Sequence, residues 1–372
     1  MTNPLACFAP EQILSSISDG VYVTDRDRRI VYWGRGAERI TGYSEEDVLG
    51  RRCCDDVLGH ATRDGRSMCG RDSCPLHRSM MLGEPSSAPV VLFAKGKAGE
   101  RIPMTVSVAP IRDEDGEVVG GVEIFRDSTE HLRDLHQART IQEMILRDEL
   151  EVDSRVRFRT HYSPFDVVGG DYYALTRLDA DRYAIMLADV TGHGISAALC
   201  TMLLRSLWEQ CRSLLDAPAK FAAEVGHRLH MLVNEQDYFA SASVGVLNVS
   251  EPSLTLTSAG NPHPLLVRGG QYQRIETSGL PLGALKRHEY TQMRLELHHG
   301  DRLLLFTDGA TDVRNGKGVL GWDGFAELLR AMDYPIRPLE LTRLEEAMLR
   351  YSDRLRLEDD LTLLEIHLPE SA

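Results

Sequence analysis

Two aspartates stand at the ends of apolar runs that are typical of neighbouring β-strands. Asp171 opens one run, Asp189 closes the next, and the polar turn Leu178–Arg182 lies between them. Both are equally distant from Ala180, so a hairpin that is symmetrical about Ala180 pairs them, with Cβ atoms about 5 Å apart. Because two carboxylates at that distance repel each other, the simplest prediction is a metal ion between them.

Further acidic residues occupy similar positions in the last part of the chain. Asp308 follows the apolar run Leu303–Thr307, and Asp359 and Asp360 come immediately before the run Leu361–Ile366. Any one of these residues can be an ordinary turn former. Several together, with no His or Cys at metal-ligand spacing nearby, favour a carboxylate site for Mg²⁺ or Mn²⁺ rather than Zn²⁺.

A second group of reactive residues lies in the first third of the chain. It contains four cysteines in one short stretch, with two histidines close by: Cys53, Cys54, Cys69, Cys74, His60 and His77. An iron–sulfur cluster, a zinc site or a redox thiol pair is possible here. The spacing matches no standard motif for these sites, so four ordinary thiols are the alternative.

The composition limits the class of protein. A chain of 372 residues is long enough for two or three domains. With 42% hydrophobic and 26% charged residues it is typical of a folded globular protein. The net charge of −14, without a basic patch, predicts no nucleic-acid or membrane partner. No apolar run is long enough to cross a membrane and no signal peptide is evident, so we expect a cytoplasmic protein.

Residues 10–129 read as a small α+β domain. Five strand-like runs alternate with turns, and helices are inserted after the second run. The runs are Gly20–Thr24, Ile30–Trp33, Pro89–Phe93, Arg101–Val108 and Val118–Phe125.

Several short motifs in this region resemble those of PAS sensor domains. They are Asp19-Gly20, Ile30-Val31-Tyr32, the segment from Ala37 to Ser44, Leu49-Gly50 and the closing segment from Arg126 to Glu130. The sequence departs from the family at Gly34, where Asn is common. The resemblance implies a PAS α/β sensor domain over residues 10–129, for which Cys53, Cys54, Cys69 and Cys74 are the candidate cofactor-binding residues.

Residues 130–151 are expected to form an amphipathic linker helix. Apolar residues recur every three or four positions: Leu132, Leu135, Ala138, Ile141 and Ile145. This stripe could lie on one of the neighbouring domains. A helix that joins two domains and carries one apolar stripe more often pairs with its copy, so we expect a homodimer through this helix.

Residues 152–372 carry a second set of motifs in one order. They are Tyr162–Pro164, Val168–Tyr173, Ala188–Ala198, Ser258–Gly260, Gly279–Gly283, Thr307–Gly309 and Asp359–Thr362. This region resembles the SpoIIE-type members of the PP2C superfamily, the bacterial branch of the metal-dependent Ser/Thr protein phosphatases. The resemblance implies an α-β-β-α sandwich, and hence a two-domain α+β protein with a PAS sensor joined by a helix to a PP2C-like phosphatase.

The same resemblance implies a set of functional residues. Those that match the family's catalytic metal ligands are Asp171, Asp189, Asp308 and Asp359, with the backbone carbonyl of Val190 as a further ligand and Asp360 just outside the direct ligands. Two Mn²⁺ or Mg²⁺ ions would activate a bridging water for in-line attack on a phosphoryl group. The implied substrate is phosphoserine or phosphothreonine on a partner such as an anti-sigma-factor antagonist with a STAS fold, and the PAS domain would control the reaction.

Other functions have weaker support in the sequence. The segment Gly169–Tyr173 matches the signature turn of diguanylate cyclases at its first three positions only. His131 and His136 in the linker helix would suit a sensor histidine kinase, but nucleotide-binding boxes do not follow them. A binding module without activity would not need four aspartates. His193, between two glycines beside Asp189, is either an acid in the reaction or a loop residue.

Overall fold

The computed structural model of the chain describes residues 9–54, 57–63, 65–69, 73–86, 89–146, 152–233, 238–316, 318–337, 339–352 and 357–370. The chain divides into two compact units, Met1–Asp134 and Leu135–Ala372. Each unit has its own hydrophobic core. They are therefore described separately.

The first unit is a single antiparallel sheet with short helices. The sheet has the strand order β2-β1-β5-β4-β3, and the helices precede, follow or connect its first strands. The elements are α1 (Pro10–Ser15), β1 (Gly20–Asp25), β2 (Ile30–Trp33), α2 (Arg35–Thr41), α3 (Glu45–Val48), α4 (Pro75–Leu82), β3 (Val90–Lys95), β4 (Arg101–Arg112) and β5 (Val118–Asp127). The five strands and the helix around Ala37 that the sequence predicts are confirmed.

One face of this sheet forms the core of the first unit. Tyr22, Trp33 and Phe125 come from β1, β2 and β5, and their ring centroids lie 5.6–6.4 Å apart. A Cβ at Gly20 would lie 2.2 Å from the Phe125 ring, so glycine is needed where β1 passes beneath that ring. These aromatic contacts explain why β1 and β5, far apart in sequence, lie side by side in the sheet.

Helix α5 (Thr129–Leu146) connects the two units. Asp127 Oδ1 accepts a hydrogen bond from the Thr129 amide at 2.8 Å, which satisfies one of the free amides at the helix start. Ile141, which belongs to the predicted apolar stripe, has a side chain that is 56% exposed in the single chain. The buried residues of α5 are Gln142 and Leu146. The last predicted residues of this helix, 147–151, lie outside the described residues.

The second unit consists of two sheets with a helix pair on each outer face. In chain order its elements are β6 (Arg157–Ser163), β7 (Asp171–Arg177), β8 (Arg182–Val190), α6 (Ile195–Gln210), η2 (Arg212–Leu214), α7 (Pro218–Val233), β9 (Ala240–Asn248), β10 (Ser253–Ala259), β11 (Leu265–Arg268), β12 (Gln271–Arg274), β13 (Met293–Glu296), β14 (Arg302–Phe306), η4 (Asp308–Ala310), β15 (Arg314–Asn315), β16 (Gly318–Val319), α8 (Gly321–Ala331), α9 (Leu341–Ser352) and β17 (Leu361–His367).

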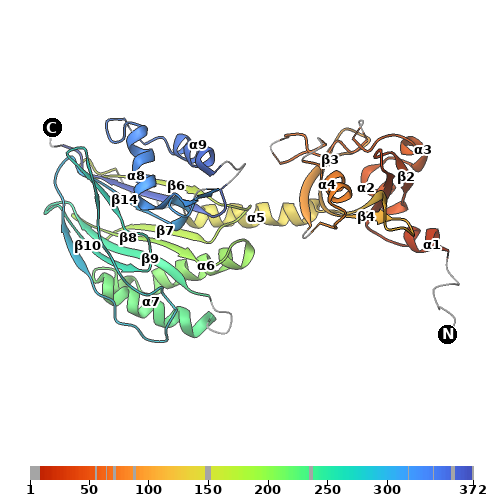
Figure 1. Cartoon of the computed structure of the whole chain (residues 1–372). Helices are drawn as coiled ribbons and strands as arrows, with labels where there is room; N and C mark the ends of the chain where they lie inside the picture. Colours follow the sequence, from red (N-terminus) through yellow and green to blue (C-terminus); the bar gives the residue numbers. More distant parts are fainter. Residues whose placement is uncertain are drawn as a thin grey trace. The chain divides into compact units, whose positions relative to one another are not determined.

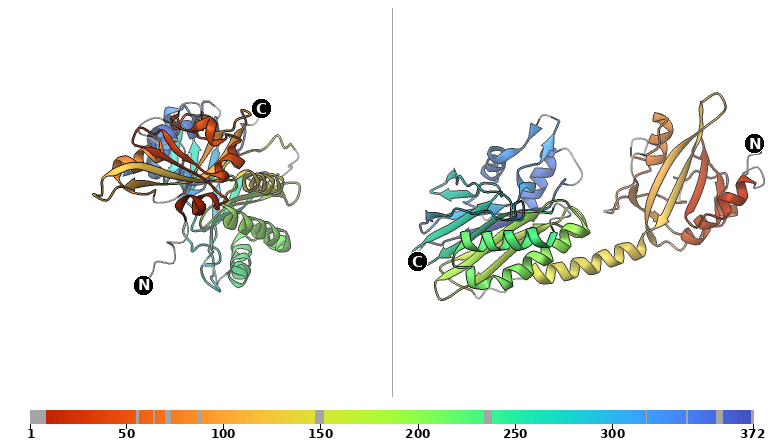
Figure 2. Two further views of the ribbon diagram at one scale, coloured as in Figure 1. Left: turned by 90° about the vertical axis from the view of Figure 1, so that its right-hand side faces the viewer. Right: turned by 90° about the horizontal axis from the view of Figure 1, so that it is seen from below.

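The order of the layers is helix, sheet, sheet, helix. The two sheets have the strand orders β13-β10-β9-β8-β7 and β12-β11-β14-β17-β6. Helices α6 and α7 lie on the first sheet, and α8 and α9 lie beside the second (Figure 1). Figure 2 shows α6 and α7 side by side in a second direction. The predicted α-β-β-α sandwich is therefore present.

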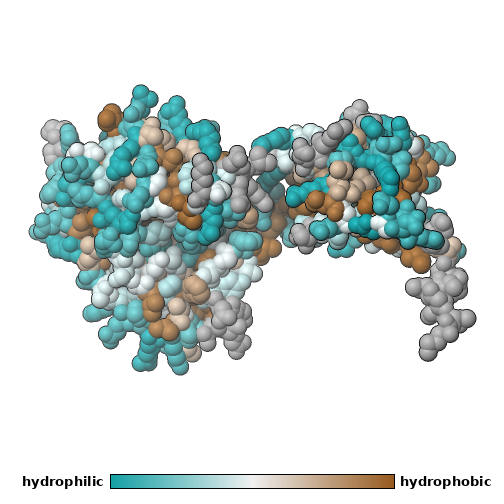
Figure 3. All heavy atoms as spheres, in the orientation of Figure 1, coloured by the Kyte–Doolittle hydropathy of each residue, from teal (hydrophilic) through white to brown (hydrophobic). Residues whose placement is uncertain are grey.

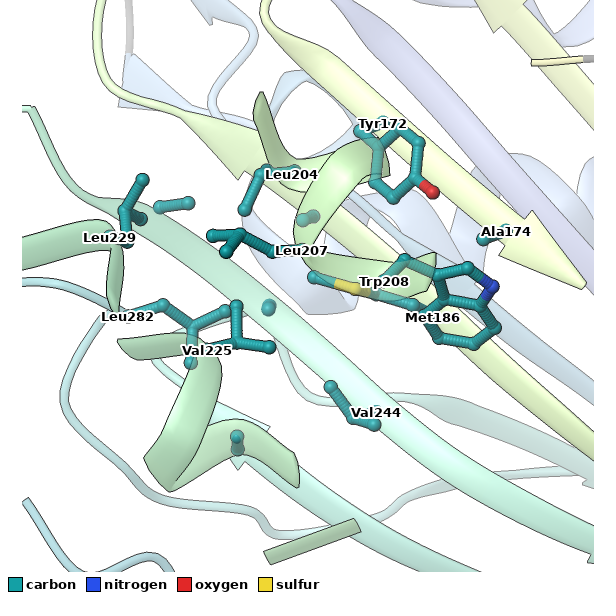
Figure 4. Packing of buried hydrophobic residues seen from close by; sticks show 14 of the residues in the cluster. Tyr172, Ala174, Met186, Leu204, Leu207, Trp208, Val225, Leu229, Val244 and Leu282 are labelled. Carbon is teal, nitrogen blue, oxygen red and sulfur yellow. The ribbon is translucent and has the colours of Figure 1, made fainter. Parts of the chain in front are cut away.

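Strand β8 shows why both faces of the first sheet are buried. Alternate side chains point to opposite sides of a strand. Ala184 and Met186 belong to the cluster beneath α6 and α7, whereas Tyr183, Ile185 and Leu187 belong to the cluster between the sheets. Figure 4 shows the first of these clusters, in which Trp208 of α6 lies near Met186 and Ala174. A strand buried on both faces needs the continuous apolar run that precedes Asp189.

In the part of the chain that the structure describes, no helix is both long enough and apolar enough to cross a bilayer. On the face that Figure 3 draws, hydrophobic side chains lie among hydrophilic ones on each unit.

Candidate active site

The β7–β8 hairpin places two of the predicted site residues opposite each other. In its register Asp171 pairs with Asp189, and the pairing continues without a break to Arg177 and Tyr183. The turn is closed by a hydrogen bond from the Leu178 amide to the Arg182 carbonyl, 2.8 Å long. The register predicted from the symmetry of the sequence is therefore confirmed.

Asp171 is fully buried, and only one of its two carboxylate oxygens has hydrogen-bond partners among the described residues. Its Oδ2 accepts hydrogen bonds from the hydroxyls of Thr307 (2.9 Å) and Thr362 (2.6 Å). Its Oδ1 is buried without a hydrogen-bond partner among the described residues. Burial, and then the nearby Asp360, raise the pKa of Asp171 well above its usual range. A buried carboxylate with one unsatisfied oxygen is a suitable ligand for a metal ion.

Asp189, Asp308 and Asp359 lie close enough to Asp171 or to one another for their charges to interact. Burial is the main cause of a raised pKa in all three. Asp189 is further affected by the charges of Asp171, Asp308 and Asp359, and the pKa of Asp308 is raised to about 6 with Asp359 as the next cause. The structure thus brings the four predicted aspartates close enough to disfavour one another's charge. A divalent cation would relieve that repulsion.

Asp360 has a different role in the geometry. Its Oδ1 accepts a hydrogen bond from the Phe165 amide (2.6 Å) and its Oδ2 accepts one from the Gly170 amide (2.5 Å). Both oxygens are therefore engaged with the backbone on either side of the Val168–Gly170 segment. Through these contacts Asp360 orients the segment that leads into Asp171. Its place outside the direct ligands stays a prediction.

Two backbone features complete the site. Val190 ends β8, and its amide donates to the Gly170 carbonyl at 3.1 Å. A Cβ at Gly170 would lie 2.9 Å from the Val190 carbonyl oxygen, so the predicted carbonyl ligand lies directly beside this glycine. A Cβ at Gly309 would lie 1.9 Å from the Asp360 carbonyl oxygen. Only glycine lets the short helix η4, which carries Asp308, lie against Asp360.

His193 stands at the edge of this cluster. It lies between Gly192 and Gly194, which both have positive φ angles, of 88° and 78°. Its ring meets Phe165 edge-on, with centroids 5.4 Å apart, and its charge lowers the pKa of Asp359 and of Asp360. Both predicted roles, an acid or a loop residue, are compatible with this position.

Some residues of the site were missed by the sequence analysis as functional residues. Thr307 and Thr362 hold Asp171, and Asp312 lies close enough to raise the pKa of Asp308 and Asp359. Asn261, which follows the Ser258–Gly260 motif, donates to Ser243 Oγ at 3.1 Å. It fixes the loop after β10 to the neighbouring strands. The two threonines belong to the motifs Thr307–Gly309 and Asp359–Thr362. Membership of these motifs was the only indication in the sequence that they have a role in the site.

The four clustered cysteines of the first unit are wholly or partly buried. Cys53 and Cys74 are buried, and Cys54 and Cys69 are partly buried. Burial raises the pKa of the thiols of Cys53 and Cys74, and that of Cys69 to about 11. Cys53, Cys69 and Cys74 are free thiols.

A metal or cluster site at these cysteines has no ligand set in the described part of the chain. Nowhere among those residues do three His, Cys, Asp or Glu side chains converge on one point as ligands. Zinc and iron–sulfur sites need three or four such protein ligands. The same finding holds for the described aspartates, of which no three converge on one point as ligands. Mg²⁺ keeps several waters and is commonly bound by one or two carboxylates.

Comparisons with known proteins agree with this description. The family model described as "Stage II sporulation protein E (SpoIIE)" matches residues 179–369, and the model described as "PAS domain" matches residues 18–130. Phosphoserine phosphatase RsbP of Bacillus subtilis is 29% identical over 184 residues, which are 48% of this chain and 45% of RsbP. Phosphoserine phosphatase RsbU of the same species is 25% identical over 233 residues, 61% of this chain and 68% of RsbU.

A solved structure supports the fold. The SiaA-PP2C domain of Pseudomonas aeruginosa has a TM-score of 0.56 and 25% identity, covering 64% of this chain and 98% of that one. The class that the fold defines is therefore that of the PP2C-type domains, preceded here by a PAS domain.

Within that class, the chain belongs to the SpoIIE family. It spans less than half of the length of RsbP. The diguanylate cyclase and histidine kinase alternatives have no support in these matches.

Proposed function

We propose that this protein is a metal-dependent phosphatase that hydrolyses phosphoserine or phosphothreonine on a partner protein. The observation that carries the proposal is the pairing of Asp171 with Asp189 beside Asp308 and Asp359. These four residues are the catalytic aspartates, and Val190 contributes its carbonyl. A set of ligands made only of oxygen suits Mn²⁺ or Mg²⁺.

The metal ions, when bound, supply a hydroxide near neutral pH and neutralise charge on the phosphoryl oxygens. The protein's own residues fix the ligands. Thr307 and Thr362 donate to one oxygen of Asp171 and leave the other free to bind metal. Asp360 holds the backbone before Asp171 through two amides. A site with such fixed ligands needs little rearrangement during the reaction.

For the substrate we propose a phosphorylated anti-sigma-factor antagonist or a similar phosphoprotein. The names of RsbP and RsbU, phosphoserine phosphatases, support the choice of phosphoserine. With a net charge of −14, the enzyme would need a locally complementary surface for an acidic partner. Free thiols, which fit the reducing cytoplasm, are present at Cys53, Cys69, Cys74, Cys200 and Cys211.

The proposal is tested with the full chain, Mn²⁺ and a panel of phosphorylated STAS-fold antagonists. We expect at least one of them to release phosphate at least about ten times faster than a random phosphopeptide, and chelation of the metal to stop the release. If every antagonist reacts no faster than the random phosphopeptide, the assignment of the partner fails. If Mn²⁺ has no effect on any substrate, the assignment of the chemistry fails.

We further propose that the PAS domain regulates the phosphatase and that the chain forms a homodimer through α5. Ile141 and Met144 on this helix are 56% and 66% exposed, which leaves apolar surface for a second copy. Sedimentation of the wild type and of Ile141→Glu tests the dimer. A variant that dimerises as tightly as the wild type would exclude this face.

A further inference from the structure

A cleft of about 530 Å³ opens between helix α7 and the loop 283–292 that precedes β13. Lys220 and His227 of α7 line one wall, and Arg287 and His288 of the loop line the other. The net charge of the chain is −14, so four residues that can carry positive charge around one concave surface are unexpected. The cleft is a separate feature from the aspartate site, since none of the four predicted aspartates lines it.

The cleft has an excess of positive charge. The side chains of Lys220 and Arg287 make no ion pair or hydrogen bond with any other described residue. Two acidic residues also line the cleft, but the Glu224 carboxylate already pairs with Arg228, with 2.6 Å between Oε1 and Nε. Only Glu289 therefore opposes the two cations. A concave surface with uncompensated positive charge attracts anions.

Hydrogen bonds hold the two walls of the cleft together. His227 Nδ1 donates to the Lys286 carbonyl (2.7 Å), and His230 Nδ1 donates to the Gly283 carbonyl (2.8 Å). Because a carbonyl oxygen can only accept, each ring carries a proton on Nδ1, and Nε2 of His227 is left for a ligand. A Cβ at Gly226 would lie 3.5 Å from the Gly283 amide nitrogen, so helix and loop are in close contact. The walls are thus fixed before any ligand binds.

We propose that this cleft binds a small organic molecule that carries a phosphate group. Lys220 and Arg287 supply the charge from opposite walls, and a phosphate offers several oxygens that can accept from both at once. The volume exceeds what a free phosphate ion needs and falls in the range of small-molecule sites. Leu214 and Ala223, which also line the cleft, provide an apolar surface for the organic part.

The test measures binding of phenyl phosphate to the full chain by titration calorimetry. A chelator is present throughout, so that no probe binds through a metal ion. Lys220→Gln and Arg287→Gln each remove one cation of the cleft, and the matched control is Arg157→Gln, an exposed position on β6 of the other sheet. We expect each cleft variant to bind phenyl phosphate at least about fivefold more weakly and the control to bind it like the wild type.

Two further measurements identify the place and the chemistry of binding. Phenyl phosphate should shift the imidazole signals of His227 and His288 in nuclear magnetic resonance spectra, because both rings line the cleft. Inorganic phosphate should displace phenyl phosphate, whereas benzoate, which has a similar ring but a carboxylate, should bind at least about fivefold more weakly.

Several results would overturn the proposal. They are no binding of phenyl phosphate by the wild type, equal affinity of both cleft variants and the wild type, and benzoate binding as tight as that of phenyl phosphate. An acidic peptide that binds through Lys220 and Arg287, without any phosphate binding, would replace the proposal with a protein docking surface. No measurement requires hydrolysis or a metal ion, so a failure of the proposed phosphatase function would leave these outcomes unaffected.

Discussion

The hydroxyl of Thr362 is expected to control how tightly the active site binds metal. It donates a 2.6 Å hydrogen bond to Asp171 Oδ2, and the Thr362 side chain is fully buried. Thr362→Val removes this donor with almost no change in shape. A hydrogen bond to a charged group contributes about 1.5–3 kcal/mol, which corresponds to roughly 10- to 150-fold in affinity.

The loss should appear in metal affinity rather than in stability. Without metal, burial raises the pKa of Asp171 well above its usual range and disfavours the ionised form, which is the form that a hydrogen-bond donor stabilises most. With metal, Asp171 is ionised and the donor acts at full strength. We therefore expect the Mn²⁺ concentration for half-maximal phosphatase activity to rise by one to two orders of magnitude. Activity at saturating Mn²⁺ should largely recover.

Thr257→Val is the matched control for this experiment. Thr257 is equally buried in the same unit, and its hydroxyl has no hydrogen-bond partner in the described structure. The same substitution there should leave the Mn²⁺ titration unchanged. A Thr362→Val protein that titrates like the wild type would refute the role of the threonine and the view that Asp171 binds metal.

Two further predictions concern the cores of the two units. In the core of the first unit, burial raises the pKa of Glu123 to about 8 and lowers the pKa of His60 to about 4. His60 Nε2 and Glu123 Oε1 lie 3.4 Å apart. Since unfolded glutamate ionises near 4.5, the contribution of Glu123 to stability falls as the pH rises from about 4.5 to about 8, whereas the contribution of His60 rises between about pH 4 and pH 6.5. Between about pH 6.5 and pH 8 only the glutamate acts, so Glu123→Gln should lose about 2 kcal/mol less stability than the wild type over that range in melts followed by circular dichroism; equal losses in both proteins would contradict the prediction. In the second unit, Gly309→Ala would place a Cβ 1.9 Å from the Asp360 carbonyl oxygen, and should lower stability by more than about 2 kcal/mol in denaturant titrations. A Cβ at Gly316 would have no atom within 4 Å, so Gly316→Ala should not lower stability in this way. Equal losses of stability in the two variants would contradict the argument.

Much of the fold could be predicted because its signals are local. The β7–β8 register follows from two apolar runs of similar length on either side of one polar turn, and a slip of one residue would reverse every side chain. Asp171 and Asp189 could therefore be paired from their positions alone. The strands of the first unit were equally clear, because turns separate them.

The rest depends on contacts between residues that are distant in sequence. Thr307 and Thr362 reach Asp171 across 136 and 191 residues, and no spacing rule carries that information. The residues of α5 that are buried within the chain could not be predicted, for a related reason. Periodicity finds apolar residues, whereas the face of α5 that contacts the second unit is centred on the polar Gln142. Its selection depends on the Gly169 carbonyl, which accepts a hydrogen bond from Gln142 Nε2 (2.7 Å) and which the helix sequence does not reveal.

The central claim is that the four aspartates bind the ions that hydrolyse the phosphoester. The most direct measurement compares phosphate release by the wild type, Asp189→Asn and the exposed control Asp216→Asn at one low Mn²⁺ concentration. We expect the control to equal the wild type and Asp189→Asn to lose at least about 100-fold in turnover while remaining folded. Near-native turnover of Asp189→Asn at low Mn²⁺ would contradict the claim.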